Sequence, residues 1–190
     1  MSNVYDSCPT FLTDRFRLRL VQRSDAAGLL RVYSDPVAQL YFNADNCHSD
    51  FRYTRLEDMQ ECVNMWLWSY KHRHFVRWVI LGEKNQPIGT IEMFRRDDGE
   101  HGEGMGLLRI DLMHQYEFPD VFDELFRTIF PAMYELFGCQ RILTKAAHYM
   151  ERRKLALVLH GFLPYKKPII GENGVEYGDY WVRSNRPHRA

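Results

Sequence analysis

Residues that commonly carry metal or nucleophilic chemistry occur in this sequence, but their spacing matches none of the standard motifs. The four cysteines are scattered, without C-x-x-C pairs or the Cys/His spacing of a zinc site. His72 and His74 flank Arg73, and no histidine pair has an acidic partner at ligand spacing. The G-x-S-x-G turn of serine hydrolases and the phosphate-binding P-loop are also missing. We therefore predict free thiols in a reducing, cytoplasmic environment and no metal site.

Two carboxylates stand in segments with the pattern of β-strands, where they could serve as general bases. Asp111 alternates with Arg109 and Met113, so these three side chains share one face of a strand. Glu92 stands in the strand-like segment before it. A general base contributes about 10²–10⁴-fold to a reaction that removes a proton. A solvated or salt-bridged role, for example Asp111 with Arg109, accounts for the same residues equally well.

Balanced charge and moderate length narrow the classes of function. Lys plus Arg and Asp plus Glu both number 25, so no net charge draws the chain to nucleic acid or to an anionic membrane. No apolar N-terminal segment resembles a signal peptide or a membrane span. We predict a single domain over 1–190, with an ordered core at about 11–183 and short tails, and neither a nucleic-acid nor a membrane partner.

The elements that position the two carboxylates follow from the periodicity of apolar residues. Alternation at every second residue predicts strands, and recurrence at every third or fourth residue predicts helices. The predicted strands are 15–21, 75–83, 88–96, 107–113, 141–147 and 175–183. The predicted helices are 24–35, 54–71, 121–137 and 151–162. This order predicts a mixed α/β sheet with helices on both faces, in which the second and third strands form an antiparallel hairpin.

Glycine and proline mark the boundaries of these elements. Gly138 and Gly161 are the expected stops of the two C-terminal helices. Pro131 lies inside the helix at 121–137 and should bend it or remove a hydrogen bond, at a local cost of about 3 kcal/mol. A glycine-rich charged segment at 97–106 should form a loop.

The order of elements and three stretches of sequence resemble the GNAT superfamily of acyl-coenzyme A N-acyltransferases, in particular its ribosomal-protein alanine/serine N-acetyltransferase-like group. The stretches are FRLRLVQRSDAAGLLRVYSDP near the start, PIGTIEMF after the hairpin, and RILTKAA through LVLHGF near the end. The likeness covers about residues 11–183. It implies a mostly antiparallel sheet of six to seven strands, in which the strands at 107–113 and 141–147 splay apart to admit the pantetheine arm of acetyl-coenzyme A.

The resemblance also implies a pyrophosphate loop with the pattern Gln/Arg-x-x-Gly-x-Gly/Ala, which opens the long helix and offers bare amides to the phosphates. Here the pattern starts at Gln115 and places Phe118 and Asp120 where glycines belong. A non-glycine residue forced to positive φ costs about 1–2 kcal/mol, and Pro119 removes one amide donor. Asp120 is also repulsive towards a phosphate. The implied coenzyme-contacting positions are Leu112, Met113, Gln115, Phe118, Asp120, Val121, Met150 and Arg153.

For catalysis the resemblance implies a carboxylate beside the splayed strands and a thiolate-protonating tyrosine in the last helix. Asp111 is the first candidate base and Glu92 the second. The family's tyrosine position holds Leu157 here, and its asparagine position holds Met150. Tyr149 is the nearest group able to reach a thiolate, with a packing role as the alternative. The basic turn around Arg153 could hold the coenzyme's 3′-phosphate or form a solvated helix face.

We therefore predict an enzyme that transfers an acetyl group from acetyl-coenzyme A to a primary amine of a small molecule or a protein N-terminus, and two alternatives stay open beside this first function. The second is a GNAT-fold binding or regulatory protein that has lost coenzyme binding. The third is transfer from a different acyl carrier. The sequence does not identify the acceptor, and a homodimer remains open.

Overall fold

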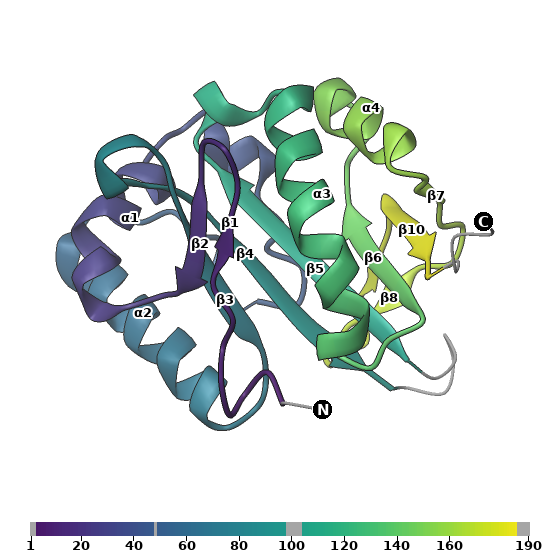
Figure 1. Cartoon of the computed structure of the whole chain (residues 1–190), viewed down its shortest axis with the longest axis horizontal. Coiled ribbons are helices and arrows are strands. Elements are labelled where there is room, and N and C mark those ends of the chain that lie inside the picture. The colour runs from purple at the N-terminus through teal and green to yellow at the C-terminus, as the bar shows by residue number, and fades with distance from the viewer. Residues whose placement is uncertain (1–2, 48, 98–103, 186–190) are drawn as a thin grey trace.

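The computed structural model describes residues 3–47, 49–97 and 104–185, and its centre is an eight-stranded sheet (Figure 1). Its strands follow one another in the order β1-β2-β3-β4-β5-β6-β10-β7. They are β1 (Phe11–Leu12), β2 (Arg17–Leu20), β3 (Val76–Leu81), β4 (Pro87–Arg96), β5 (Met105–Leu112), β6 (Arg141–Lys145), β7 (Leu163–Pro164) and β10 (Tyr180–Ser184). A separate two-stranded sheet joins β8 (Ile169–Ile170) to β9 (Glu176–Tyr177). All the sheet pairings are antiparallel except that of β5 with β6.

Helices cover both faces of the large sheet, as the sequence predicts. The helices α1 (Ala26–Tyr33) and α2 (Leu56–Lys71) pack on one face, and α3 (Pro119–Leu136) and α4 (Glu151–Leu159) lie together on the other (Figure 1). Short 3-10 turns precede α1 (Arg23–Asp25) and α3 (His114–Tyr116) and follow α1 (Ala38–Tyr41). The mixed α/β sheet is confirmed, and its eight strands exceed the predicted six to seven because β1 and β7 are two-residue edge strands.

The alternation of side chains along β3 explains how the two layers are built. Val76, Trp78 and Ile80 enter the apolar core beneath α3 and α4. Val79 and Leu81 enter the second core, beneath α1 and α2. Successive residues of a strand point to opposite faces, so Arg77 also faces α1 and α2. The buried guanidinium of Arg77 therefore lies on the α1/α2 face of the sheet.

The parallel pair β5 and β6 separates part of the way along its length. The hydrogen-bonded register runs from Met105 opposite Arg141 to Leu108 opposite Thr144. Beyond that point β5 continues to Leu112 and stays paired only with β4. The gap between the ends of β5 and β6 is the splay that the family resemblance implies. It places the loop after β5 beside the start of α4.

Local differences from the predicted elements have identifiable causes. Asp179 adopts φ 63° and divides the predicted last strand into β9 and β10. The helix predicted at 121–137 begins earlier, at Pro119, because proline is well suited to the first helical position. It runs unbroken through Pro131 and is followed by Gly138 at φ 57°. Of the predicted glycine-rich loop, residues 98–103 lie outside the described residues.

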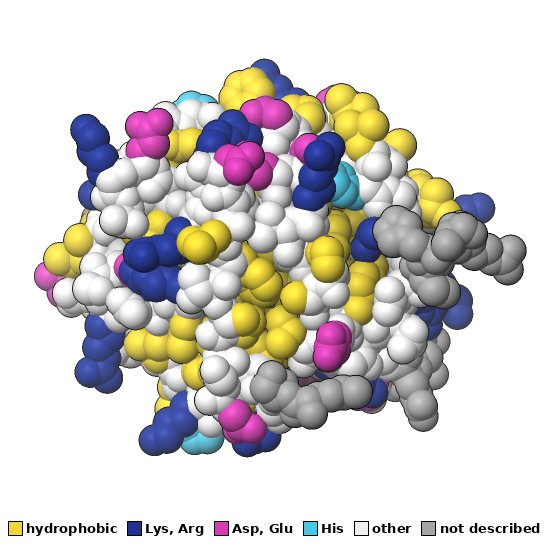
Figure 2. All heavy atoms as spheres, viewed as in Figure 1, with side chains coloured by type: hydrophobic (Ala, Val, Ile, Leu, Met, Phe, Trp, Pro, Cys, Tyr) yellow, Lys and Arg dark blue, Asp and Glu magenta, His cyan; other side chains and the backbone are white. Residues whose placement is uncertain are grey.

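The surface carries both signs of charge. Figure 2 shows basic and acidic side chains interspersed over the face that α3 and α4 cover. No described helix combines the length and the apolar character needed to cross a membrane.

Candidate functional site

The loop that joins β5 to α3 lies where the resemblance places coenzyme phosphates, but several of its backbone amides donate to carbonyls of the loop itself. The amide of Glu117 donates to the carbonyl of His114 at 3.1 Å, and that of Phe118 donates to Tyr116 at 2.8 Å. The amide of Val121 donates to the carbonyl of Phe118 at 3.1 Å. Phe118 has φ −125°, an extended conformation without glycine's left-handed geometry. The loop is therefore a self-bonded turn rather than an open cradle of amides.

A buried ion pair joins this loop to the start of α4. The carboxylate of Glu117 accepts hydrogen bonds from the guanidinium of Arg153, and both side chains are less than 5% exposed. Arg153 also donates to the carbonyl of Tyr41 at 3.1 Å. The predicted phosphate-binding arginine is thus neutralised by a carboxylate of the chain itself. Because Glu117 follows β5 and Arg153 follows β6, the pair bridges the two segments that leave the separated strands.

The first turn of α3 is held by a second set of charges. Arg15 pairs with Asp120 at 2.9 Å and with Glu124 at 2.5 Å. The backbone amide of Arg15 also donates to Glu124 at 2.7 Å. Arg15, in the turn between β1 and β2, is therefore the internal partner of both carboxylates at the start of α3. Asp120, predicted as a coenzyme contact, binds an internal cation.

The other predicted coenzyme contacts fall into buried and exposed groups. Leu112, Val121 and Met150 are buried in the core beneath α3 and α4. Met113 packs on the opposite core, beneath α1 and α2. Phe118 is 39% exposed, and the guanidinium carbon of Arg152 lies 4.1 Å from its ring centroid. The remaining position, Gln115, is exposed in the 3-10 turn before α3.

Tyr149, predicted as a candidate acid, lies at the edge of the gap. Its hydroxyl donates to the carbonyl of Leu40 at 2.7 Å, and its ring packs edge-on against Tyr41. The segment around Tyr41 therefore crosses from α1 to the start of α4. These contacts give Tyr149 a structural partner.

The two candidate bases lie on the opposite face, buried in one polar network around Arg77. The Arg77 guanidinium donates to Glu92, to Asp111 at 3.2 Å and to the Tyr33 hydroxyl at 3.0 Å. Tyr33 donates to Asp111 at 2.8 Å, and Arg109 pairs with Glu92 at 2.9 Å. Asp111 and Glu92 are each 1% exposed. The salt-bridged alternative thus describes both carboxylates, with Arg77 as the shared partner.

Burial and neighbouring charges shift the pKa values of Glu92, in the Arg77 network, and of Glu117, in the pair with Arg153, in opposite directions. Burial alone would raise the pKa of Glu92, but Arg77 and Arg109 outweigh it and leave that pKa lowered. Burial raises the pKa of Glu117, and Arg153 offsets this only in part. In the Arg77 network, Asp111 Oδ1 has no hydrogen-bond partner within the described residues.

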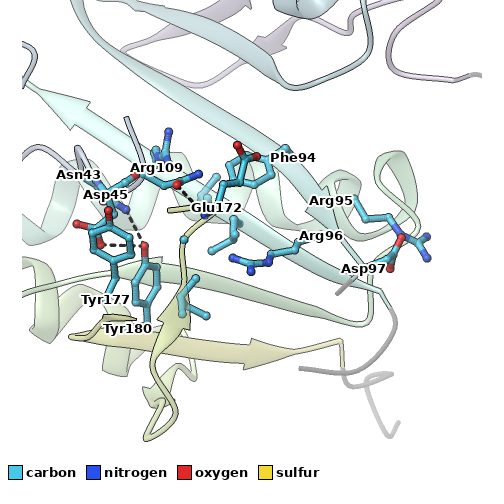
Figure 3. Close-up of a pocket in the computed structure, with 15 residues that line it drawn as sticks. Asn43, Asp45, Phe94, Arg95, Arg96, Asp97, Arg109, Glu172, Tyr177 and Tyr180 are labelled. Carbon is cyan, nitrogen blue, oxygen red and sulfur yellow. Dashed lines mark hydrogen bonds and ion pairs between the residues drawn. The ribbon is translucent and has the colours of Figure 1, made fainter. Parts of the chain in front are cut away.

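A cavity of about 330 Å³ opens on the α1/α2 face of the sheet, beside the β8–β9 hairpin (Figure 3). Its apolar walls include Phe94, Leu107 and Ile169, and its polar groups include Arg96 and Glu172. Several partly buried hydrogen bonds lie beside it. Lys145 contacts both carboxylate oxygens of Asp45 at 2.7 Å, and the Tyr180 hydroxyl donates to the same carboxylate at 3.1 Å.

Sequence reasoning missed several residues that organise these sites. The buried position of Arg77 could have been predicted, since an arginine amid the apolar residues of β3 needs a buried partner. The buried position of Glu117 could not be predicted from its neighbours in the sequence, because its partner Arg153 lies 36 residues away. The cavity residues Asp45 and Glu172 come from loops without a recognisable pattern. Within the three described ranges, no cluster of His, Cys, Asp and Glu is arranged to hold a metal ion.

Comparison with solved structures identifies the fold. A GNAT-family acetyltransferase from Bacillus anthracis is 13% identical, with a TM-score of 0.66 over 93% of this chain and 98% of that one. The ribosomal L7/L12 α-N-protein acetyltransferase RimL, solved in complex with coenzyme A, is 12% identical, with a TM-score of 0.70 over 93% and 98%. The ribosomal-protein-S5-alanine acetyltransferase from Vibrio fischeri is 16% identical, with a TM-score of 0.66 over 96% and 100%. No family model and no curated protein matches the sequence.

The chain therefore has the fold of the GNAT acetyltransferases, including those of the ribosomal-protein serine/alanine group. Similarity at this level of identity concerns architecture alone. The residues around the gap do not fit the diphosphate of coenzyme A, because Glu117 already neutralises Arg153 and several loop amides donate to carbonyls of the loop. A phosphate there would have to displace a buried carboxylate.

Proposed function

We propose that this chain is a GNAT-fold binding protein in which an internal ion pair takes the place of coenzyme A phosphate recognition. The buried pair between Glu117 and Arg153 carries the proposal. A buried cation needs an anion, and in this chain a glutamate supplies it without a ligand. The family's glycines are replaced by Phe118 and Asp120, which removes the other means of holding a diphosphate.

Coenzyme A could reach Arg153 only by displacing the carboxylate of Glu117. To bind, a coenzyme phosphate would have to break the pair and leave Glu117 as an unpaired charge in a site that is about 3% exposed. Leaving one partner of a buried ion pair uncompensated costs about 3–5 kcal/mol. That cost lowers an affinity by roughly two to three orders of magnitude or more.

A second candidate, acetyl transfer from acetyl-coenzyme A to a primary amine, is favoured by one observation. The strands β5 and β6 still separate beyond Leu108 and Thr144, which is where an acyl-pantetheine arm would lie. RimL, which shares this fold, was solved with coenzyme A. In this chain the pantetheine arm would have to bind without the loop amides and glycines that hold the diphosphate in the family.

A thermal-shift titration with coenzyme A separates the two candidates. Ligand at one hundred times its Kd stabilises a protein by about 2.7 kcal/mol, which raises Tm by several degrees. We expect no rise at millimolar coenzyme A, and we expect no thiol release from acetyl-coenzyme A with a panel of primary amines. RimL serves as the positive control. A saturable rise in Tm together with amine-dependent thiol release would establish the transferase instead.

A further inference from the structure

We infer that an apolar strip on the outer face of α4 and on β7 is the surface at which two copies of this chain form a symmetric dimer. The strip consists of Leu155, Val158 and Leu159 on α4 and Leu163 on β7. Figure 2 shows apolar side chains gathered over α4 and beside β7, at the upper right of the molecule. The inference goes beyond the proposed function, because Arg153 lies on the buried face of α4 and the strip on its exposed face.

The first observation is that α4 is apolar on two faces, of which only one is covered. Residues 155–159 read Leu-Ala-Leu-Val-Leu, without a polar side chain. Ala156 and Leu157 are buried in the core beneath α3 and α4, whereas the four side chains of the strip are 52–68% exposed. A helix that is apolar on all sides is normally buried on all sides. We therefore expect the outer face of α4 to be covered in the functional protein.

The position of the strip determines how a partner could contact it. Its three residues on α4 are three and four positions apart, which places them side by side on the helix. Gly161, at φ 77°, follows α4 and turns the chain into β7, the edge strand of the large sheet. Pro164 on β7 has no amide hydrogen, so this edge is poorly suited to pairing with a strand of another chain. A partner would therefore contact the strip through side chains.

The residues outside the described ranges are poorly suited to cover the strip. Residues 98–103 read Asp-Gly-Glu-His-Gly-Glu, and residues 186–190 read Arg-Pro-His-Arg-Ala. Segments with this many charged and polar groups do not bury aliphatic side chains well, because their own polar groups would lose water. The N-terminal end of the described chain lies well away from α4 (Figure 1). A second molecule therefore fits this surface better than these residues do.

The chemistry of the strip favours a second copy of this chain over an unrelated protein. Its four side chains are all aliphatic, and homodimer interfaces are more apolar than those of proteins that associate transiently. An uncharged strip is complementary to an identical strip. Because the chain has 25 basic and 25 acidic residues, two copies do not repel each other through net charge.

Two-fold symmetry gives the contact a definite arrangement. In a symmetric dimer the same patch of both copies meets, so residue i contacts residue j and j contacts i. Antiparallel packing of the two α4 helices, about an axis near the middle of the strip, places Leu155 of each copy beside Leu159 of the other. Opposite ends of the two helix dipoles then lie together, which is favourable. The exposed charges Glu151 and Arg152, at the start of α4, fall at the rim of this contact.

Analytical ultracentrifugation over a range of concentrations tests the dimer. We expect a mass of twice 22.7 kDa, which falls towards that of one chain on dilution. Leu159→Glu should raise the dimer dissociation constant about tenfold or more, because symmetry buries the introduced charge twice. Leu12→Glu is the matched control, since Leu12 is 70% exposed on β1 at the opposite edge of the sheet. Circular dichroism verifies that both variants fold.

Two results of the ultracentrifugation would overturn the inference. One is a chain that stays monomeric at every concentration, which would leave the strip to an unrelated partner. The other is a dimer that Leu159→Glu weakens no more than Leu12→Glu does.

Mixing charged variants tests the antiparallel arrangement. Leu155→Glu and Leu159→Lys should each be monomeric alone, because either homodimer would bury two unpaired charges. An equal mixture of the two should dimerise, because the carboxylate of one variant meets the ammonium of the other. A mixture of Leu155→Glu with Leu159→Glu is the control and should stay monomeric, because two carboxylates would meet. Dimers in both mixtures, or in neither, would contradict the proposed contact.

Discussion

The two faces of the gap between β5 and β6 handle charge in opposite ways. On the α3/α4 face, Glu117 and Arg153 neutralise each other in a buried pair, and Arg15 neutralises the acids at the start of α3. On the α1/α2 face, the exposed carboxylate of Glu172 lines a cavity and has no ion-pair partner among the residues that the structure describes. Arg153 therefore has its counter-ion inside the protein, whereas the carboxylate of Glu172 is exposed to solvent. The two faces thus differ in whether their charges are paired internally.

The largest expected effect comes from breaking the buried pair on the closed face. Arg153→Ala leaves Glu117 buried without a cation, so we expect the free energy of unfolding to fall by about 3–5 kcal/mol. Urea denaturation measures this change.

A matched double variant separates two effects on the free energy of unfolding: the net contribution of the ion pair, and the cost of leaving one buried charge without its partner. Glu117→Met combined with Arg153→Met replaces both charges by apolar side chains, and we expect it to recover most of the lost stability. A double variant as unstable as Arg153→Ala would show that the pair makes a large net contribution to stability. It would contradict the expectation that apolar side chains can replace the pair.

Dependence on pH should distinguish Glu117 on the closed face from Glu92 in the Arg77 network. The pKa of Glu117 is raised by burial, so the folded state binds its proton more tightly than the unfolded chain does. Its contribution to stability is present below the unfolded pKa of about 4.5 and is lost as pH rises above it. The pKa of Glu92 is lowered, because Arg77 and Arg109 outweigh burial, so its contribution is present above about 4.5 and is lost as pH falls.

Substitution by glutamine makes this contrast measurable. The destabilisation caused by Glu117→Gln should shrink between pH 4.5 and pH 7, whereas that of Glu92→Gln should grow as pH rises through the range below 4.5. Denaturant titrations over this range give both trends. Identical trends for the two variants would contradict the opposite pKa shifts.

The smallest effect is expected at the exposed charges that flank the closed site. Arg15 is 46% exposed and Asp120 66% exposed, so screening by solvent limits their pairing. Arg15→Ala should lower the free energy of unfolding by about 1 kcal/mol or less, and it should not create coenzyme binding. Arg23→Ala, at another partly exposed arginine bonded to Asn64, is a suitable control. A gain of coenzyme affinity in Arg15→Ala would show that the surface charges, and not the buried pair, close the site.

The strands and helices could be predicted because the periodicity that indicates each of them lies within one short segment of sequence. The apolar alternation of β3 and β4 and the helical spacing of α2 and α3 each lie within one segment, and the structure confirms these elements. The hairpin between β3 and β4 has Lys84 and Asn85 at positive φ, as its tight turn requires. The division of the last strand at Asp179 was not predicted, although aspartate is several-fold enriched at positive φ.

The arrangement of the site depended on pairs distant in sequence. The buried position of Glu117 follows from Arg153, and that of Asp111 follows from Arg77 and Tyr33. Periodicity marks which face a residue occupies, but it does not identify the partner across the fold. The roles predicted for Asp111, Glu92 and Tyr149 remain predictions, since the structure gives each of them a structural partner and no substrate.

Calorimetric titration of coenzyme A into the unmodified protein tests the central claim most directly. We expect no saturable heat of binding at millimolar coenzyme A, because Glu117 already neutralises the Arg153 guanidinium that a phosphate would need. A one-to-one isotherm with a micromolar Kd would contradict it and would return the chain to the coenzyme-dependent transferases.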